Sequence, residues 1–251
     1  MSSGQKNPNG INLNNIAIVL HKPRYPENIG AAARALCNMG LKRLLVVDPE
    51  NYDMDKVRKL ATHAASDIIE HIEIYEALDQ ALADFNYIVG TTARVGSQRR
   101  TINAPSLPAE KLASISAGNL IAILFGPEDR GLANEDIRNC HLLVNIPTSN
   151  FSSLNLAQAV MIICYELFTY SCEEKKKDLT PRLANRHELE GMYAHLKDIL
   201  VKISYINAEN PDYWMNKLRH FFNRLPLRAG EVSIIRGICR QIDWYGKRKR
   251  D

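Results

Sequence analysis

Five short, almost continuously apolar runs alternate with stretches of helical periodicity, and this alternation restricts the fold of the 251-residue chain most strongly. Short runs rich in Val, Ile and Leu predict strands that are buried on both faces. Strands separated by helical segments pair in parallel, because the helix carries the chain back across the sheet. We therefore expect an α/β domain with a mostly parallel sheet and helices on both faces. The expected strands are IAIVLH (16–21), RLLVVD (43–48), YIVGTT (87–92), LIAILFG (120–126) and LLVNIP (142–147).

Helical segments are expected between these strands and after the last one. The segment 28–40 is rich in alanine, with Asn28 in an N-cap position and Gly40 where a helix C-cap belongs. Two further helices are expected near 54–64 and 75–84. The segment NLAQAVMIICYELFTY (155–170) is apolar almost all round, which predicts a helix buried in the core or packed on a partner chain.

The pattern changes beyond residue 172, and this change predicts the domain organisation. Charged residues and Pro181 in CEEKKKDLTP interrupt the hydrophobic periodicity, as in a linker. We divide the chain into a flexible leader (1–14), an α/β domain (15–172), a linker (173–181) and a small all-helical module (182–251). The module should contain three helices, whose apolar faces hold Met192, Leu196, Ile199, Ile203 and Ile206, then Trp214, Leu218 and Phe221, then Val232, Ile235, Cys239 and Ile242.

Charge is distributed unevenly between these parts. Residues 1–180 hold 18 Lys and Arg against 20 Asp and Glu, whereas residues 181–251 hold 14 against 8 and end in GKRKRD. A basic module indicates a polyanionic partner. A solvated basic surface with a loose tail explains the same charges, so charge alone leaves both interpretations open.

Cysteine usage and apolar run lengths indicate the compartment. The five cysteines are scattered, without a CxxC pair or histidines at metal-ligand spacing, which predicts reduced thiols and no metal site. The first 15 residues have no apolar signal core, and no run approaches the roughly 20 apolar residues of a membrane span. A cytoplasmic protein that binds neither membrane nor metal is expected.

Polar segments follow three of the predicted strands, at the edge where open parallel sheets bind ligands. GTTAR (90–94) suits a tight turn close to a ligand, or an ordinary Gly-Thr turn. PEDRGLANED (127–136) is neither a phosphate-binding loop with GK[ST] nor a dinucleotide fingerprint, and it is either a solvated turn or a ligand-binding loop. As a ligand-binding loop, its acidic residues argue against phosphate and for a cationic or hydroxyl-bearing ligand. In NFSSLNLAQAV (150–160) one of Ser152, Ser153 or Asn155 caps a helix, and the surplus polar groups need other partners.

Arg34 lies in the alanine-rich segment NIGAAAR, which we expect to be buried. A buried guanidinium needs an anionic or carbonyl partner, so a structural salt bridge and a ligand contact are the two interpretations. The small residues between Asn28 and Arg34 allow another backbone or a substrate to approach closely.

Three motifs, NIGAAARA (28–35), FGPEDRGLAN (125–134) and IPTSNFSSLNLAQAV (146–160), occur in an order and spacing that strongly resemble the SpoU-like (TrmH-like) branch of the SPOUT methyltransferases. The resemblance implies a deep C-terminal trefoil knot, S-adenosyl-L-methionine as cofactor, and a homodimer with the active site at its interface. It implies a cofactor pocket formed by Thr91, Thr92, Ala93, Gly126, Ile146, Ser153, Leu154 and Asn155. It also implies catalytic or substrate-positioning roles for Asn28, Arg34, Glu128, Ser153 and Asn155.

Within that branch, the GTTAR turn and the segment MNKLRHFFNR…EVSIIRGIC resemble enzymes that methylate the ribose 2′-oxygen of tRNA, at cytidine or uridine 32 of the anticodon loop. Because a guanidinium stays charged in proteins, we expect Arg34 to bind a phosphate and stabilise an alkoxide rather than act as a base. Glu128 is expected to orient Arg34 or the sulfonium side of the site. Methylation of ribosomal RNA and non-catalytic RNA binding are the alternatives. Besides Arg34, the RNA-binding candidates are Arg219, Arg224, Arg228, Arg236 and Arg240 in the basic module.

Overall fold

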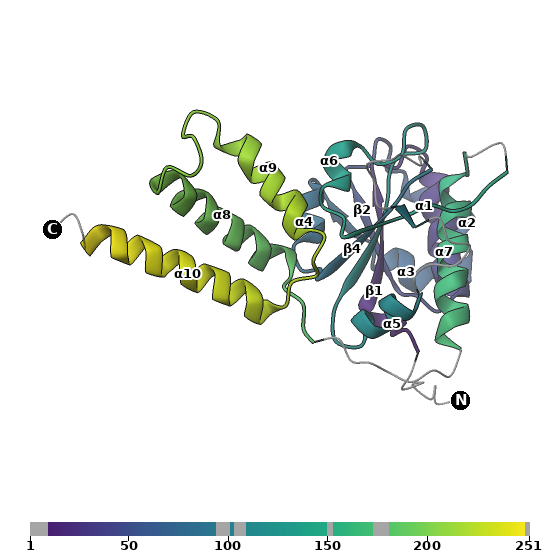
Figure 1. Ribbon diagram of the computed structural model, residues 1–251. Helices are drawn as coiled ribbons and strands as arrows, with labels where there is room; N and C mark the ends of the chain where they lie inside the picture. The colour runs from purple at the N-terminus through teal and green to yellow at the C-terminus, as the bar shows by residue number, and fades with distance from the viewer. Residues whose placement is uncertain (1–9, 94–100, 103–108, 150–152, 173–180, 249–251) are drawn as a thin grey trace. The chain divides into compact units, whose positions relative to one another are not determined.

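A computed structural model describes residues 10–93, 101–102, 109–149, 153–172 and 181–248. The chain divides into two compact units, Met1–Thr180 and Pro181–Asp251 (Figure 1). Of the expected linker (173–181), residues 173–180 lie outside the described residues.

The first unit is built on a seven-stranded sheet in which every strand pair is parallel. The strand order is β3-β2-β1-β6-β4-β7-β5. The strands are β1 (Ile16–His21), β2 (Arg43–Val47), β3 (Glu73–Tyr75), β4 (Tyr87–Thr91), β5 (Thr101–Ile102), β6 (Ile121–Phe125) and β7 (Leu142–Val144). All five predicted strands are confirmed. The two that were not predicted, β3 and β5, form the sheet edges and are only three and two residues long, too short to leave an apolar run in the sequence.

Helices cover both faces of this sheet, as predicted (Figure 1). On one face α1 packs against α2 and α7, and on the other α4 packs against β2 and β3. The helices of this unit are α1 (Pro26–Asn38), α2 (Met54–Ala61), α3 (Ser66–Glu70), α4 (Leu78–Leu82), α5 (Ala109–Ser116), α6 (Asn134–Ile137) and α7 (Leu156–Ser171), with 3₁₀ turns η1 (Leu13–Asn15) and η2 (His63–Ala65). The helix predicted near 75–84 is shorter than expected, because residue 75 belongs to β3.

Alternate residues of the central strand serve the two faces. Ala17 and Val19 of β1 belong to a buried cluster with Ala81 and Leu82 of α4. Ile18 lies between them and must point to the opposite face, since successive strand side chains alternate. All six residues of β1 are buried, which explains its continuous apolar sequence.

The end of the expected leader is packed against the domain. Ile11 is buried, and the backbone N–H of Asn12 donates to Ser116 Oγ at 2.9 Å. Asn15 Nδ2 donates to the Ser116 carbonyl at 2.7 Å. The prediction of a flexible leader is therefore wrong for residues 10–14, and residues 1–9 lie outside the described part of the chain.

The second unit contains α8 (Arg186–Lys202), α9 (Pro211–Phe222) and α10 (Ala229–Arg248). Its core includes Met192, Tyr193, Met215 and Val232. Three predicted helices are thus confirmed, but the predicted inner face of α9 is wrong. Trp214 and Phe221 are 40% and 55% exposed, while their neighbours Met215 and Phe222 pack inward. Trp214 and Phe221 have the same helical spacing as Met215 and Phe222, so spacing does not distinguish the two faces. The prediction chose the face with the larger aromatic side chains, which is the exposed one.

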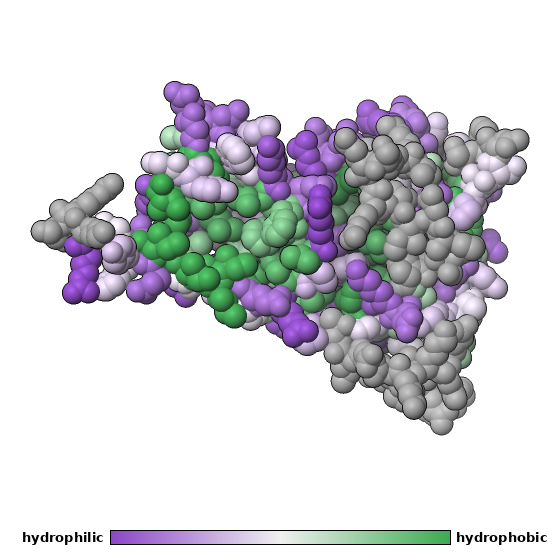
Figure 2. All heavy atoms as spheres, in the orientation of Figure 1, coloured by the Kyte–Doolittle hydropathy of each residue, from purple (hydrophilic) through white to green (hydrophobic). Residues whose placement is uncertain are grey.

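Several large apolar side chains of this unit remain exposed. Figure 2 shows hydrophobic residues gathered on one face of the helical unit. By exposed fraction, Ile203 is 51% exposed, although it was predicted to lie on an inner apolar face. Ile234, Ile238, Trp244 and Tyr245 of α10 are also more than half exposed. A partner surface is the usual meaning of such a patch.

Candidate active site

Asn28 lies inside the first turn of α1 and does not cap it. The helix begins at Pro26, and Pro at the first helical position lacks only an N–H that would have no intrahelical partner. The side chain of Asn28 is therefore free for other contacts, and it is buried, with 8% exposure. The prediction of Asn28 as N-cap is wrong. The N-cap is Tyr25, because Pro26 starts the helix closer to the N-terminus. At the other end, Met39 is the C-cap and Gly40 follows it with φ of 73°.

Asn155 is the cap of α7. Its Oδ1 accepts hydrogen bonds from the backbone N–H groups of Ala157 at 2.9 Å and Gln158 at 3.3 Å. Of the three capping candidates, Asn155 takes this role. Ser153 lies outside the helix and is exposed, and Ser152 lies outside the described residues. The other half of the Asn155 amide, Nδ2, donates to Asn28 Oδ1 at 2.9 Å.

A third motif residue completes a chain of hydrogen bonds. Asn28 Nδ2 donates to Glu128 Oε1 at 2.7 Å. The carboxylate can only accept and the N–H groups of α7 can only donate, so the orientations of both amides between them are fixed. Glu128, Asn28 and Asn155, one from each of the three sequence motifs, are thus held in a single arrangement. Glu128 was expected to orient Arg34 or the sulfonium side of the site; in the structure its carboxylate accepts a hydrogen bond from Asn28.

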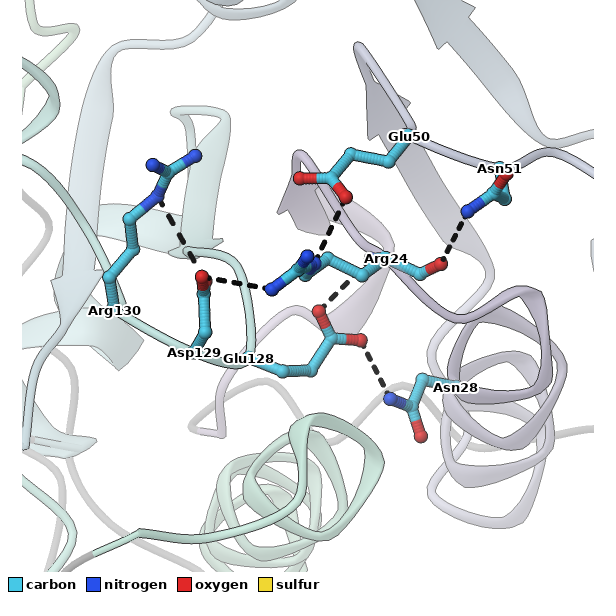
Figure 3. A network of polar contacts seen from close by, with 7 residues as sticks. All are labelled: Arg24, Asn28, Glu50, Asn51, Glu128, Asp129 and Arg130. Atoms are coloured by element: carbon cyan, nitrogen blue, oxygen red, sulfur yellow. Dashed lines mark hydrogen bonds and ion pairs between the residues drawn. The ribbon is translucent and has the colours of Figure 1, made fainter.

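Arg24 holds the Glu128 loop against the start of α1 (Figure 3). Its backbone N–H donates to Glu128 Oε2 at 3.0 Å, and its guanidinium contacts Asp129 at 3.0 Å and Glu50 at 2.9 Å. The hydrogen bond and charge of Glu50 raise the pKa of Arg24 above its ordinary value. Arg24 was not among the predicted site residues, because the sequence KPRYP indicated only a turn.

A cavity of about 290 Å³ lies at the carboxyl ends of β4 and β6. Seven of the eight residues predicted for the cofactor pocket line it: Thr91, Thr92, Ala93, Gly126, Ile146, Ser153 and Leu154. Asn155 is not part of its wall. The remaining lining residues are Phe125, Pro127, Glu128, Asp129, Arg130, Gly131, Leu132, Leu156 and Ala159. Glu128 therefore belongs both to the cavity wall and to the hydrogen-bond chain.

Gly126 is required by the crossing of two backbone segments at this cavity. A Cβ at Gly126 would lie 2.3 Å from the carbonyl carbon of Gly131 and from the nitrogen of Leu132. Gly90 was expected in a tight turn close to a ligand, but its role is different. A Cβ there would lie 2.6 Å from Cys140 Sγ, so Gly90 makes room for core packing and not for a ligand. The two threonines after it are fixed by Thr91 Oγ1 donating to the Leu124 carbonyl at 3.0 Å and by the Thr92 N–H donating to the Val144 carbonyl at 2.9 Å.

Arg34 is exposed, contrary to the prediction that it is buried. It lies on a face of α1 that does not enter the core, whereas Ala32, Ala33 and Ala35 are fully or almost fully buried. Within the described part of the chain Arg34 forms no ion pair or hydrogen bond. The expected structural salt bridge is therefore not found there, and the guanidinium is accessible to a ligand.

The arginines predicted to bind RNA in the helical unit differ in their surroundings. Arg219 donates two hydrogen bonds of 2.6 Å to Glu190 and lies 4.3 Å from the centre of the Tyr193 ring. Burial raises the pKa of Glu190, but the hydrogen bond from Arg219 and the charges of two arginines bring it below its ordinary value. Arg219 is thus part of the framework of this unit. Arg224, Arg228 and Arg240 are exposed, and Arg236 is partly buried.

The described segments hold neither a candidate metal site nor a candidate membrane span. They contain no group of three or more His, Cys, Asp or Glu side chains placed to hold a metal ion. No helix among them is long and apolar enough to span a bilayer. All five cysteines are free thiols.

Residues 15–165 match the SpoU rRNA Methylase family, and residues 187–251 match the C-terminal domain of the tRNA methyltransferase TrmJ. The α/β unit is accordingly that of a SpoU-type methylase. Among curated proteins, the tRNA (cytidine/uridine-2′-O-)-methyltransferase TrmJ of Sodalis glossinidius is 38% identical and aligns over 92% of both chains. The tRNA (cytidine/uridine/adenosine-2′-O-)-methyltransferase TrmJ of Pseudomonas aeruginosa is 34% identical over 90% of this chain and 93% of its own. The chain belongs to the TrmJ family.

Solved structures agree with this assignment. TrmJ from Z. mobilis ZM4 superposes with a TM-score of 0.73 at 29% identity, covering 90% of this chain and 98% of its own. A probable methylase family protein from Haemophilus influenzae Rd KW20 gives a TM-score of 0.60 at 31% identity, over 94% and 99%. Membership in this family carries with it the expectation of the C-terminal trefoil knot.

Proposed function

We propose that the protein transfers a methyl group from S-adenosyl-L-methionine to the ribose 2′-oxygen of cytidine or uridine in tRNA. The observation that carries this proposal is the hydrogen-bond chain from Glu128 through Asn28 to Asn155, which starts at a cavity wall and ends at a helix N-terminus. It links a small-molecule cavity to a buried polar group in the helix that presents Arg34. Position 32 of the anticodon loop is expected from the family resemblance.

The cavity fits the cofactor in size and chemistry. Its volume of about 290 Å³ is at the lower end of the range for small-molecule sites. Two carboxylates in its wall, Glu128 and Asp129, match a ligand that carries a sulfonium cation and ribose hydroxyls. When bound, S-adenosyl-L-methionine supplies an electrophilic methyl group on that sulfonium. Thr91, Thr92, Ala93, Gly126, Ile146, Ser153 and Leu154 would enclose it, and Asn155 would fix the position of Ser153 and Leu154 by anchoring α7.

The protein's own contribution to the reaction is positioning and charge stabilisation. Arg34 binds the phosphate next to the reacting ribose and stabilises negative charge as the 2′-oxygen attacks. Because a guanidinium stays protonated, the hydroxyl proton leaves to a phosphate oxygen or water. Ser153, in the cavity wall, and the Asn28–Asn155 pair hold the ribose side of the site in line with the cofactor.

The helical unit is the proposed tRNA-binding module. Of the arginines predicted to bind RNA, Arg224, Arg228 and Arg240 are exposed. Exposed aromatic residues accompany them: Lys217 Nζ lies 4.4 Å from the ring centre of Tyr213 and 4.9 Å from that of Trp214. Cations together with exposed rings suit phosphates and unstacked bases in a loop of RNA. The match of residues 187–251 to the TrmJ C-terminal domain supports tRNA over ribosomal RNA.

Substitution of this module's arginines tests its role. Changing Arg224, Arg228 and Arg240 together to Gln should weaken tRNA binding and flatten the plot of log Kd against log salt by about 0.7 to 0.9 per lost phosphate contact. Lys197, whose Nζ contacts Asp212 at 2.7 Å, provides the control substitution. Unchanged affinity and slope in the triple variant would assign the unit a structural role.

A homodimer is proposed from the outer face of α7. Ile162, Tyr165 and Phe168 are 37%, 54% and 39% exposed on a helix whose other face is buried in the core. Spacings of three residues place them along one side, which suits packing against a second copy. Tyr165→Lys should lower the molar mass measured by light scattering from two chains toward one. Ile74→Lys, at an equally exposed position of β3, is the control. A wild-type monomer would contradict the proposal.

The activity is tested by mapping 2′-O-methylated nucleosides by mass spectrometry. Total tRNA from cells with and without the protein is compared, and purified protein is then incubated with unmodified tRNA and cofactor. A methyl group at C or U 32 that depends on the protein is expected. Methylation of ribosomal RNA instead would establish the alternative substrate, and binding of tRNA without methyl transfer would establish a non-catalytic RNA-binding protein.

A further inference from the structure

A second cavity of the α/β unit lies away from the proposed cofactor site. It measures about 340 Å³ and is formed where α2 ends and the chain continues through η2 into α3. Three of its side chains are basic: Arg58, Lys59 and His63. The others that line it are Thr62, Ser66, Ile69 and Glu70. None of these residues belongs to the three sequence motifs.

The two cations at this cavity are not neutralised by the protein. Neither Arg58 nor Lys59 forms an ion pair with any residue that the structure describes, and both are exposed. Lys56, on the same helix but outside the cavity, contacts Asp53 at 3.8 Å. Glu70 is the one carboxylate in the described wall, so the cavity is positive overall. Its chemistry therefore selects an anion.

Thr62 shapes this cavity through an unusual backbone conformation. Its φ of 62° and ψ of 164° lie in a region that is almost restricted to glycine, and strained residues of this kind cluster at ligand-binding sites. The conformation separates α2 from η2 and brings Arg58 and His63 to the wall of one cavity. Ser66 Oγ donates to the His63 carbonyl at 2.8 Å, which fixes the far side of the turn.

The segment that forms this cavity packs against the helix that carries Arg34. A Cβ at Gly30 would lie 2.1 Å from the Val57 carbonyl oxygen, and Cys37 Sγ donates to the Ala64 carbonyl at 3.0 Å. Both contacts join residues 27 apart in sequence, so α1 runs beside the α2–η2 segment in the same direction. Arg34 lies between Gly30 and Cys37 on this side of α1, about 4.5 Å along the axis from Cys37. It is thus level with the end of α2.

We propose that this cavity binds a phosphate group of the RNA backbone, in the same strand as the phosphate held by Arg34. The inference rests on the proposed function and extends it, because it assigns part of the RNA grip to the α/β unit itself. A polyanion offers phosphates at regular intervals, so a second cationic site, on the segment packed against α1, fixes the direction of the strand across α1 and α2. Arg58 and Lys59 bind the phosphate oxygens, and the Thr62 hydroxyl is a further donor.

The test is the double substitution Arg58→Gln/Lys59→Gln in the full chain. The KM for tRNA should rise several-fold, and the slope of log KM against log salt should fall by about one. The Kd for S-adenosyl-L-methionine, measured by calorimetry, and kcat at saturating tRNA should stay at wild-type values. Lys56→Gln, on the same helix but outside the cavity, is the control. It should leave the KM for tRNA, the salt slope, the Kd for the cofactor and kcat unchanged.

Several results would overturn the proposal. One is an unchanged KM and salt slope in a double variant that unfolds at the wild-type temperature. Another is a slope reduced equally by Lys56→Gln, which would show only general attraction. Protection of wild type but not of the double variant by millimolar inorganic phosphate in thermal unfolding, with an unchanged KM for tRNA, would make the cavity a site for a free anion. If the proposed function itself is wrong, the wild-type protein transfers no methyl group to tRNA. That result is distinct from a failure of the phosphate site alone.

Discussion

Asn28 and Asn155 are joined by a hydrogen bond of 2.9 Å although 127 residues separate them in the sequence. Each amide uses its other half for a partner that cannot be exchanged: Asn28 donates to the Glu128 carboxylate, and Asn155 caps α7. The position of the α7 N-terminus is therefore coupled to the position of α1. In a bound state, the loop that encloses the cofactor and the helix that carries Arg34 would be held in fixed relation.

The substitution Asn155→Asp separates the two roles of this residue. Aspartate caps a helix as well as asparagine does, so we expect the free energy of unfolding to change by less than about 0.5 kcal/mol. The donor to Asn28 is lost, and a carboxylate faces Asn28 Oδ1. Asn28 cannot flip in response, because Glu128 holds its NH₂ group. We expect kcat to fall at least about tenfold, because the partly buried hydrogen bond to Asn28, which also contacts the Glu128 carboxylate, is lost. Transfer of labelled methyl groups to tRNA measures kcat. Wild-type kcat would show that the bond only supports the fold.

Arg34→Lys tests whether the reaction needs the shape of the guanidinium. Lysine keeps the positive charge but loses the planar set of donors. We expect kcat to decrease on the order of a hundredfold, as when a donor to a developing oxyanion is removed, with an unchanged Kd for the cofactor. Near-wild-type activity would mean that Arg34 acts as a point charge and that its geometry is unimportant.

Gly126→Ala tests the backbone crossing at the cavity. The new Cβ would meet the Gly131 and Leu132 backbone at 2.3 Å, so the loop 126–132 must move. Overpacking of this kind costs about 1–3 kcal/mol, and we expect cofactor binding to be lost in calorimetric titration. Gly118→Ala is the matched control, because a Cβ there has no neighbour within 4 Å. Equal effects of the two substitutions would contradict the crossing as their cause.

The pair formed by Arg43 and Glu73 predicts a pH dependence of stability. Hydrogen bonds from Arg43 hold the pKa of Glu73 below its ordinary value of 4.5. A depressed carboxylate pKa contributes stability that is complete above the unfolded value and is lost as the pH falls through the folded value. At pH 7 the free energy of unfolding of the wild type should exceed that of Glu73→Gln by up to about 1 kcal/mol. This difference should shrink below about pH 4.5. Urea unfolding at pH 7, 5, 4 and 3 measures it; a difference independent of pH would contradict the assignment.

The sequence predicted the sheet well, because five of its strands are buried on both faces and leave continuous apolar runs. It failed where side chains carry little information about burial. The edge strands β3 and β5 are too short to show periodicity, and Trp214 and Phe221 are large apolar residues that lie on the outer face of α9.

The candidate site was predicted residue by residue, but its internal contacts were not. The family resemblance named seven residues that line one cavity. The contact between Glu128 and Asn28 could not be predicted, because it joins a loop to a helix 100 residues away in the sequence. Arg24 was missed for the same reason: its contacts with Glu50, Glu128 and Asp129 are tertiary. Arg34 was expected to be buried because its neighbours are alanines, and composition does not tell which position of such a helix faces solvent.

The strand order has a consequence for how the chain reaches this state. β1 pairs with β2 on one edge as soon as residue 47 is available, but its other edge pairs with β6, about 105 residues later. Until Phe125 has been synthesised, the central strand keeps one side unpaired, and α1 lacks its contacts with α7 until residue 171. Such non-local pairing slows folding and leaves strand edges open to other chains. The methylase unit should therefore acquire protease resistance in one late step during translation, after α7 has emerged, and not strand by strand.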